Sequence, residues 1–83
     1  MMKGQIVESV VKFIVSEIAE DLDSLEVSVT EEGPDEVVAE VRASKPDMGR
    51  VIGRRGRVAK SIRILAQAAA DEEGLQAQVE FAD

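Results

Sequence analysis

The sequence predicts a single α+β domain, spanning residues 1–83, whose elements follow the order α-β-β-α-α-β. Residues 5–22 carry apolar side chains at helical spacing, whereas three other segments alternate apolar and polar residues as strands do. A helical stretch of about thirty residues separates the last two predicted strands, and such a crossover suits a parallel pairing. We therefore expect a three-stranded mixed sheet with three helices packed on one face.

The first predicted helix covers residues 5–22. Its apolar stripe consists of Val7, Val10, Val11, Ile14, Val15, Ile18 and Leu22. Most of these residues are β-branched, which lowers intrinsic helix propensity, so packing against the rest of the fold must hold the helix.

Two strands joined by a turn are predicted next. Residues 25–30 and 36–43 alternate, and Glu32-Gly33-Pro34-Asp35 between them is typical of a turn, so the pair forms an antiparallel hairpin. Residues 75–81 alternate in the same way and form the last strand.

Two helices are predicted between the hairpin and the last strand. Pro46 suits the first position of a short helix, which ends at glycines 53 and 56. A second helix runs from about 57 to 70, buries Val58, Ala59, Ile62, Ala66 and Ala69, and ends near Gly74. The acids at 71–73 lie at the negative end of that helix, so we expect fraying there.

The amino-acid composition limits the kinds of protein that this sequence can encode. The chain has no cysteine and no histidine, which excludes disulfides and thiolate metal sites and fits a reducing compartment. Charged residues interrupt the apolar stretch at the N-terminus, so it does not resemble a signal peptide, and no segment approaches the length of a membrane span. We expect a soluble cytoplasmic protein.

Charge is strongly segregated along the chain. Eight of the ten basic residues fall within positions 42–63 beside a single acid, giving that window +7, while the remainder carries −14 and the whole −7. A surface with mixed signs is not normally divided in this way, so the pattern points to an anionic partner that touches one place.

The basic window surrounds the stretch Val51-Ile52-Gly53-Arg54-Arg55-Gly56-Arg57. Glycine lets a ligand approach the backbone closely, arginine offers a planar fork of donors to phosphate, and a helix that starts after Gly56 adds free N–H groups. The alternative is that the two glycines only form a tight turn between helices, because Gly-x-x-Gly is a common pattern.

An enzyme is not expected. Without histidine or cysteine no nucleophile has a base at motif spacing, and the glycines match neither a dinucleotide site nor a nucleotide-binding P-loop. The acids at 31–36 and 71–73 lack the spacing of a cation site, so we expect neither a metal nor a cofactor.

The stretch from Gly49 to Ile62, together with the order of elements, resembles a K-homology (KH) domain of type II. The run from Asp47-Met48-Gly49-Arg50 to Ile62-Arg63, together with the expected absence of a second domain, is similar to small stand-alone bacterial KH proteins of the KhpA type. The resemblance covers nearly the whole chain and is most specific between Gly49 and Ile62.

The resemblance implies binding of single-stranded RNA and a role as an RNA chaperone or post-transcriptional regulator. It implies that Gly53 and Gly56 allow close approach of the RNA backbone, that Arg54 and Arg55 contact phosphates, and that Val51 and Ile52 form an apolar floor under the bases. From charge and proximity we add three residues: Arg50, Arg57 and Lys60. The other wall of the groove is expected from the strand at 36–43, through Val38 or Arg42.

A competing interpretation is a protein-interaction module whose basic patch meets an acidic partner. On the second long helix Ile64 points away from the buried stripe, Leu65 lies at its edge and Ala68 is nearby, so an apolar strip is exposed. The resemblance implies self-association, and together with the apolar strip it leads us to expect a homodimer through this helix. The resemblance also implies pairing with a larger RNA-binding protein of the KhpB/Jag type.

Overall fold

The computed structural model describes residues 3–82 and has the predicted order of elements. The bounds are α1 Gln5–Ile18, β1 Glu26–Glu31, β2 Glu36–Arg42, α2 Lys45–Ile52, α3 Arg57–Glu72 and β3 Gln76–Ala82, with short 3-10 turns at Leu22–Ser24 and Arg54–Gly56. Within the described residues, no helix has both the length and the apolar character needed to cross a bilayer.

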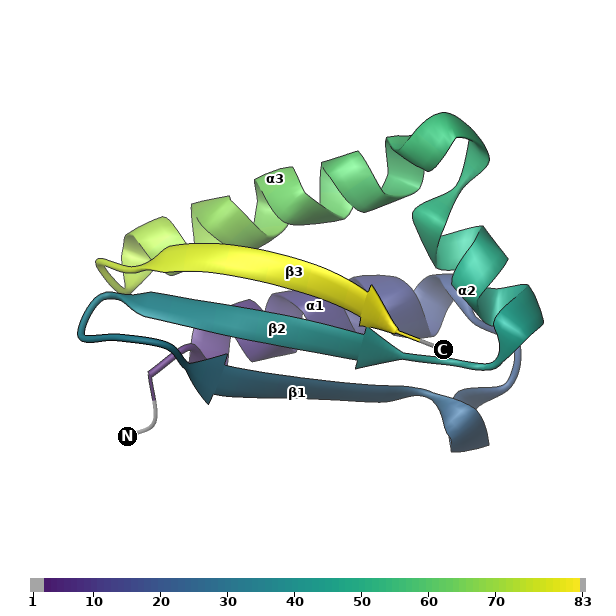
Figure 1. Cartoon of the computed structure of the whole chain (residues 1–83), viewed down its shortest axis with the longest axis horizontal. Coiled ribbons are helices and arrows are strands. Elements are labelled where there is room, and N and C mark those ends of the chain that lie inside the picture. The colour runs from purple at the N-terminus through teal and green to yellow at the C-terminus, as the bar shows by residue number, and fades with distance from the viewer. Residues whose placement is uncertain (1–2, 83) are drawn as a thin grey trace.

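The sheet has the strand order β1-β2-β3. β1 pairs with β2 in antiparallel orientation, with Val29 opposite Ala39, and β2 pairs with β3 in parallel, with Ala39 opposite Val79. The predicted mixed sheet is confirmed, and β3 is an edge strand that runs beside α3 (Figure 1).

The helices lie on one side of the sheet, as predicted. α1 and α3 run antiparallel behind the strands and α2 stands at the end of this layer (Figure 1). The inward side chains of β2 and the apolar stripes of both long helices form the core between the layers; among its fully buried members are Val7, Val11, Val37, Val41, Ile62 and Ala66. The opposite face of the sheet carries no helix and presents the polar residues of each strand.

The first helix is shorter than its apolar pattern predicts. It ends at Ile18 because Ala19 is extended, and Leu22 lies in a 3-10 turn with 57% of its surface exposed. The prediction that the helix and its buried stripe continue to residue 22 is therefore wrong. The helix ends early because the backbone N–H groups of Glu20 and Asp21 donate to the carboxylate of Asp47, which is distant in the sequence, and not to the preceding turn of the helix.

The last helix is longer than predicted, and the acidic segment at its end binds the N-terminus of α1. It continues through Glu72 and closes with Gly74 in a left-handed conformation, while the N–H of Leu75 donates to Ala70 O at 2.9 Å. The Glu73 carboxylate then accepts the N–H groups of Gly4 and Ile6 at 3.0 and 3.1 Å. This carboxylate caps the N-terminus of α1 and joins it to the end of α3.

Candidate nucleic-acid interface

The loop between α2 and α3 is built from left-handed backbone. Gly53 has φ 79° and ψ 172°, Arg55 has φ 60° and Gly56 has φ 71°. The turn is closed by two backbone bonds, from Gly53 N–H to Gly49 O at 2.9 Å and from Gly56 N–H to Gly53 O at 3.1 Å. Three positive φ angles within four residues turn the chain sharply and leave the loop projecting at the end of the helical layer (Figure 1).

The two glycines of the motif have different roles. A Cβ atom at Gly53 would lie 2.4 Å from Val58 Cγ2 and 3.0 Å from Val58 N, so this glycine lets the start of α3 pack against the end of α2. A Cβ atom at Gly56 would meet nothing within 4 Å. The open space beside Gly56 is the place where an external chain can approach the backbone.

Arg54 and Arg55 both lie exposed on the loop. Among residues 3–82 the ion pairs join Arg42 to Glu40 and Arg50 to Glu20 and Asp47, and none includes a loop arginine. Arg55 also holds a left-handed conformation that costs a residue other than glycine about 1–2 kcal/mol. A strained backbone that carries an uncommitted guanidinium is typical of a ligand-binding segment.

The N-terminus of α3 adds to the positive character of the loop. Its N-cap is Gly56, no side chain caps it with a hydrogen bond, and its first turn contains no acid. Arg57 and Lys60 lie exposed on this first part of the helix. The positive end of the helix dipole, two loop arginines and these two residues therefore lie together.

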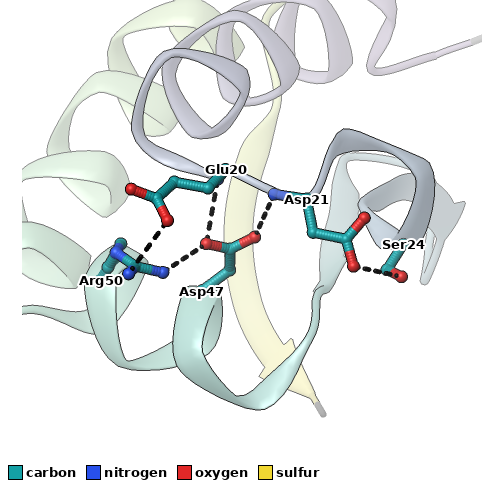
Figure 2. A network of polar contacts seen from close by, with 5 residues as sticks. All are labelled: Glu20, Asp21, Ser24, Asp47 and Arg50. Atoms are coloured by element: carbon teal, nitrogen blue, oxygen red, sulfur yellow. Dashed lines mark hydrogen bonds and ion pairs between the residues drawn. The ribbon is translucent and has the colours of Figure 1, made fainter.

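Arg50, which the charge pattern placed with the loop arginines, is held by acidic groups of the protein itself. One of its terminal nitrogens, Nη1, donates to Asp47 Oδ1 at 2.8 Å, and Nη2 lies 3.2 Å from Glu20 Oε1 (Figure 2). Asp47 is 1% exposed, and its two oxygens also accept the N–H groups of Glu20 and Asp21 at 3.0 and 2.9 Å. This Asp47–Arg50 network fastens α2 to the segment that follows α1.

The network also sets the ionisation of Asp47. The N–H groups of Glu20 and Asp21 that hold the carboxylate lower its pKa below the ordinary value of 3.8, and Arg50 lowers it further, while burial opposes these effects. The side chain therefore stays ionised at neutral pH, as the three hydrogen bonds to it require.

The apolar residues before the loop divide between core and surface. Val51 is fully buried, whereas Ile52 and Val58 are half-buried. The family resemblance implied that both Val51 and Ile52 would present an apolar floor. The helical phase of α2 instead turns Val51 inward with Met48, so among these residues only Ile52 and Val58 offer apolar surface beside the loop.

The strand next to the loop helices is β3, and this corrects a second expectation. Val38 and Arg42 belong to the central strand, and their side chains alternate with the buried Val37, Ala39 and Val41, so they lie on the helix-free face. They do not line a groove beside the loop. The residues that face α3 from β3 include Phe81, over whose ring the Arg63 guanidinium lies at 5.2 Å. The alternation of residues 75–81 indicated that Phe81 lies on the buried face of a strand. It did not indicate that this strand is the one beside α3.

A three-stranded mixed sheet, helices on one face and a Gly-x-x-Gly turn between two of them define a KH domain of type II. The profile of the family described as "KhpA/KhpB, KH domain" matches residues 8–81. The chain therefore belongs to the KhpA/KhpB family of KH domains.

Curated relatives agree with this assignment. The chain is 37% identical over 73 residues to "RNA-binding protein KhpA" of Borreliella burgdorferi, covering 88% of each chain. It is 38% identical over 77 residues to the protein of that name from Clostridium perfringens, covering 93% of this chain and 96% of the relative. The Bacillus subtilis protein of the same name is 32% identical over 82 residues, covering 99% and 100%.

Proposed function

We propose that this protein binds single-stranded RNA at the loop of residues 53–56 and the first turns of α3, and acts as an RNA chaperone or post-transcriptional regulator. The observation that carries the proposal is the loop itself, whose left-handed backbone presents Arg54 and Arg55 with no acidic partner among residues 3–82. Relatives that match most of the chain are named RNA-binding proteins, which supports the same ligand.

The sugar–phosphate backbone of the RNA would run over Gly56, where no side chain blocks the approach. Arg54 and Arg55 would contact its phosphates from the loop, and Arg57 and Lys60 from the helix that follows. The bases would turn toward Ile52 and Val58, the half-buried apolar residues on either side of the loop. KH domains hold about four nucleotides in this manner.

Arg50 would act differently from the other basic residues that the sequence singled out. Its guanidinium is bound by Asp47 and Glu20, and releasing it to a phosphate would leave the buried Asp47 carboxylate without its cation. We therefore assign Arg50 to the support of α2, and through it of the loop, rather than to the RNA.

The test replaces Arg54 and Arg55 with aspartate and measures binding of a labelled short single-stranded RNA by fluorescence polarisation. The matched control replaces Lys12 and Arg42 with aspartate, which changes the net charge equally on exposed positions away from the loop. We expect the loop variant to lose binding and the control to keep most of it, with circular dichroism unchanged in both. Equal affinities of the loop variant and the wild type would refute the proposal.

A second candidate function, self-association through α3, is favoured by the exposure of its outer face. Ile64 and Leu65 are 61% and 47% exposed, and Ala68 lies exposed one turn further on. Arg57 lies seven residues before Ile64 and Glu72 seven residues after Leu65, that is, about two turns to either side. An antiparallel pair of α3 helices with its two-fold axis between Ile64 and Leu65 would bury this strip and place Arg57 of each copy near Glu72 of the other.

Charge reversal tests this register directly. Leu65→Asp should give a monomer by light scattering with the fold intact. Arg57→Glu alone and Glu72→Arg alone should each weaken the dimer, and the double variant should restore it. A double variant weaker than either single change would exclude the antiparallel register. The same strip could instead receive a larger KhpB/Jag-type protein, in which case Leu65→Asp would abolish the mixed complex and the isolated wild type would be a monomer.

A further inference from the structure

The outer edge of β3 is covered by side chains of α3 at two levels. Gln67 bridges two backbone groups, donating to Leu75 O at 3.2 Å and accepting the N–H of Ala77 at 3.0 Å. Two residues further along the strand, Arg63 Nε donates to Val79 O at 3.3 Å. Ala77 and Val79 are alternate residues of the edge strand β3, and Leu75 directly precedes it. Among the described residues no further strand pairs with the outward N–H and C=O groups of β3.

The two covers differ in how much of their bonding capacity they use. Both N–H donors of the Gln67 amide are used, since its nitrogen also donates to Asp71 Oδ1 at 2.9 Å, and its oxygen accepts one bond. Arg63 uses only Nε, in a long bond, and both of its terminal nitrogens have no hydrogen-bond or ion-pair partner among residues 3–82. Gln67 therefore closes the strand edge, whereas Arg63 presents a fork of free donors beside it.

Among residues 3–82, no acid holds Arg63 in position. Its Nε is held by the Val79 carbonyl and its guanidinium carbon lies 5.2 Å from the centre of the Phe81 ring. Such a cation–π contact orients the group while leaving its net charge uncompensated. Contacts with β3 thus orient the Arg63 guanidinium, and its two terminal nitrogens have no partner among residues 3–82.

Arg63 lies on the same side of α3 as the glycine loop. Gly56, Lys60 and Arg63 are spaced by four and then three residues, so they follow one face of the helix over about 10 Å. β3 runs beside this face (Figure 1). An RNA strand gripped at Gly56 and lying along α3 would reach the Arg63 fork within the few nucleotides that a KH domain holds.

We infer that Arg63 is a specificity-determining residue that reads a guanine in the nucleotides beyond the glycine loop. The planar pair of terminal donors matches the O6 and N7 acceptors of guanine, which is the commonest base-specific contact of arginine. A phosphate would accept the same fork, but the Arg63 guanidinium lies over the Phe81 ring at the edge formed by β3. The proposed binding mode gives the phosphates to the loop arginines, so we assign this fork to a base that extends past the loop toward β3. This inference rests on the proposed RNA binding at the loop and adds a base preference to it.

The experiment compares a labelled oligouridine with its single-guanosine variants, using wild type, Arg63→Gln and Arg63→Lys. We expect one position of the guanosine to raise wild-type affinity by about 5- to 150-fold, the range of a good bidentate base contact. In that oligonucleotide 7-deazaguanosine, which lacks N7, should abolish most of the gain. Arg63→Gln should lose the preference, with a much smaller fall in affinity for oligouridine, which reflects the lost charge alone, than for the oligonucleotide that contains the preferred guanosine. Arg63→Lys retains the charge without the planar fork and should show a reduced preference.

Lys60→Gln is the matched control, since it removes a charge one turn nearer the loop on the same face. It should lower affinity for every oligonucleotide alike, with a shallower salt dependence and an unchanged guanosine preference. The inference is overturned if wild type shows no guanosine preference. It is also overturned if Arg63→Gln behaves like Lys60→Gln, because that result identifies a phosphate contact. Should wild type bind none of the oligonucleotides, the proposed function itself fails; binding that needs Arg54 and Arg55 but ignores guanosine rejects only the role of Arg63.

Discussion

Replacing each motif glycine by alanine should have unequal effects, although the two look equivalent in the sequence. Gly53 lies at φ 79° and ψ 172°, a region that is essentially restricted to glycine, and occupying it costs another residue about 1–3 kcal/mol. The added Cβ would also lie 2.4 Å from Val58 Cγ2 and 3.0 Å from the Val58 backbone nitrogen. A side chain can rotate away but a backbone nitrogen cannot, so we expect Gly53→Ala to lower the free energy of unfolding by about 3 kcal/mol or more.

Gly56→Ala should be milder for the fold and severe for the ligand. Its left-handed φ of 71° costs alanine about 1–2 kcal/mol, and the new Cβ meets no atom within 4 Å. Gly49→Ala is the control, since Gly49 lies inside α2 with open space around its Cα and should gain about 0.5–1 kcal/mol. A domain of this size has a free energy of unfolding of about 4–12 kcal/mol, so all three differences are measurable.

Urea unfolding followed by circular dichroism gives the three free energies, and RNA affinity is measured at a temperature where every variant is folded. Each kcal/mol should lower the Tm by about 4–8 °C in a domain of this size. If Gly53→Ala and Gly56→Ala destabilise the fold equally, the packing role of Gly53 is wrong. If Gly56→Ala binds RNA as the wild type does, the open side of the loop is not where the ligand approaches.

Three further changes probe the supports of the site. Asp47→Asn removes the ionised acceptor of three hydrogen bonds. The pKa of Asp47 in the folded protein lies below the ordinary value of 3.8. The carboxylate therefore stabilises the fold fully above pH 3.8, and this stabilisation is lost as the pH falls through the lowered pKa. The wild type should thus be more stable than the variant at neutral pH, with the difference shrinking in acid, and a pH-independent difference in urea midpoints would contradict this. Glu73→Ala should lower the free energy of unfolding by about 1 kcal/mol, as loss of a helix N-cap does, and should raise hydrogen exchange in the first turn of α1, whereas unchanged exchange there would exclude the cap. Arg50→Gln should weaken RNA binding together with stability and leave the salt dependence of binding unchanged, whereas loss of affinity alone with a shallower salt dependence would identify Arg50 as a phosphate ligand.

The regular elements could be predicted because apolar periodicity records which face of each segment is buried. The alternation of β2 is confirmed at Val37, Ala39 and Val41, and the stripe of α3 at Ala59, Ile62, Ala66 and Ala69, whereas Val58 is only half-buried. The end of α1 could not be predicted in this way. The Asp47 carboxylate ends it by taking the N–H groups of Glu20 and Asp21, and a contact across that separation leaves no trace in a local pattern.

The position of the glycine loop could be predicted from the sequence. The ion pairs and the burial of the residues around it could not. Glycine spacing and charge located Arg54 and Arg55, but the same criteria also selected Arg50, whose acidic partners come from another segment. Val51 and Ile52 are adjacent apolar residues, and only the phase of α2 decides that the first is buried. The contact between Arg63 and Phe81 could not be predicted, because the sequence did not show that β3 is the edge strand beside α3.

The left-handed backbone of Arg55 means that the free protein is less stable than its sequence could make it. Asparagine or glycine at this position would relax the turn and stabilise the unliganded domain by about 1 kcal/mol. Two backbone hydrogen bonds within the chain, from Gly53 N–H to Gly49 O and from Gly56 N–H to Gly53 O, already close the turn. We therefore expect the loop to lose little conformational entropy if it binds RNA as proposed. The chain thus keeps a guanidinium where conformational preference alone would select a smaller residue. If Arg55 contacts RNA as proposed, that contact is made by a residue that lowers the stability of the fold.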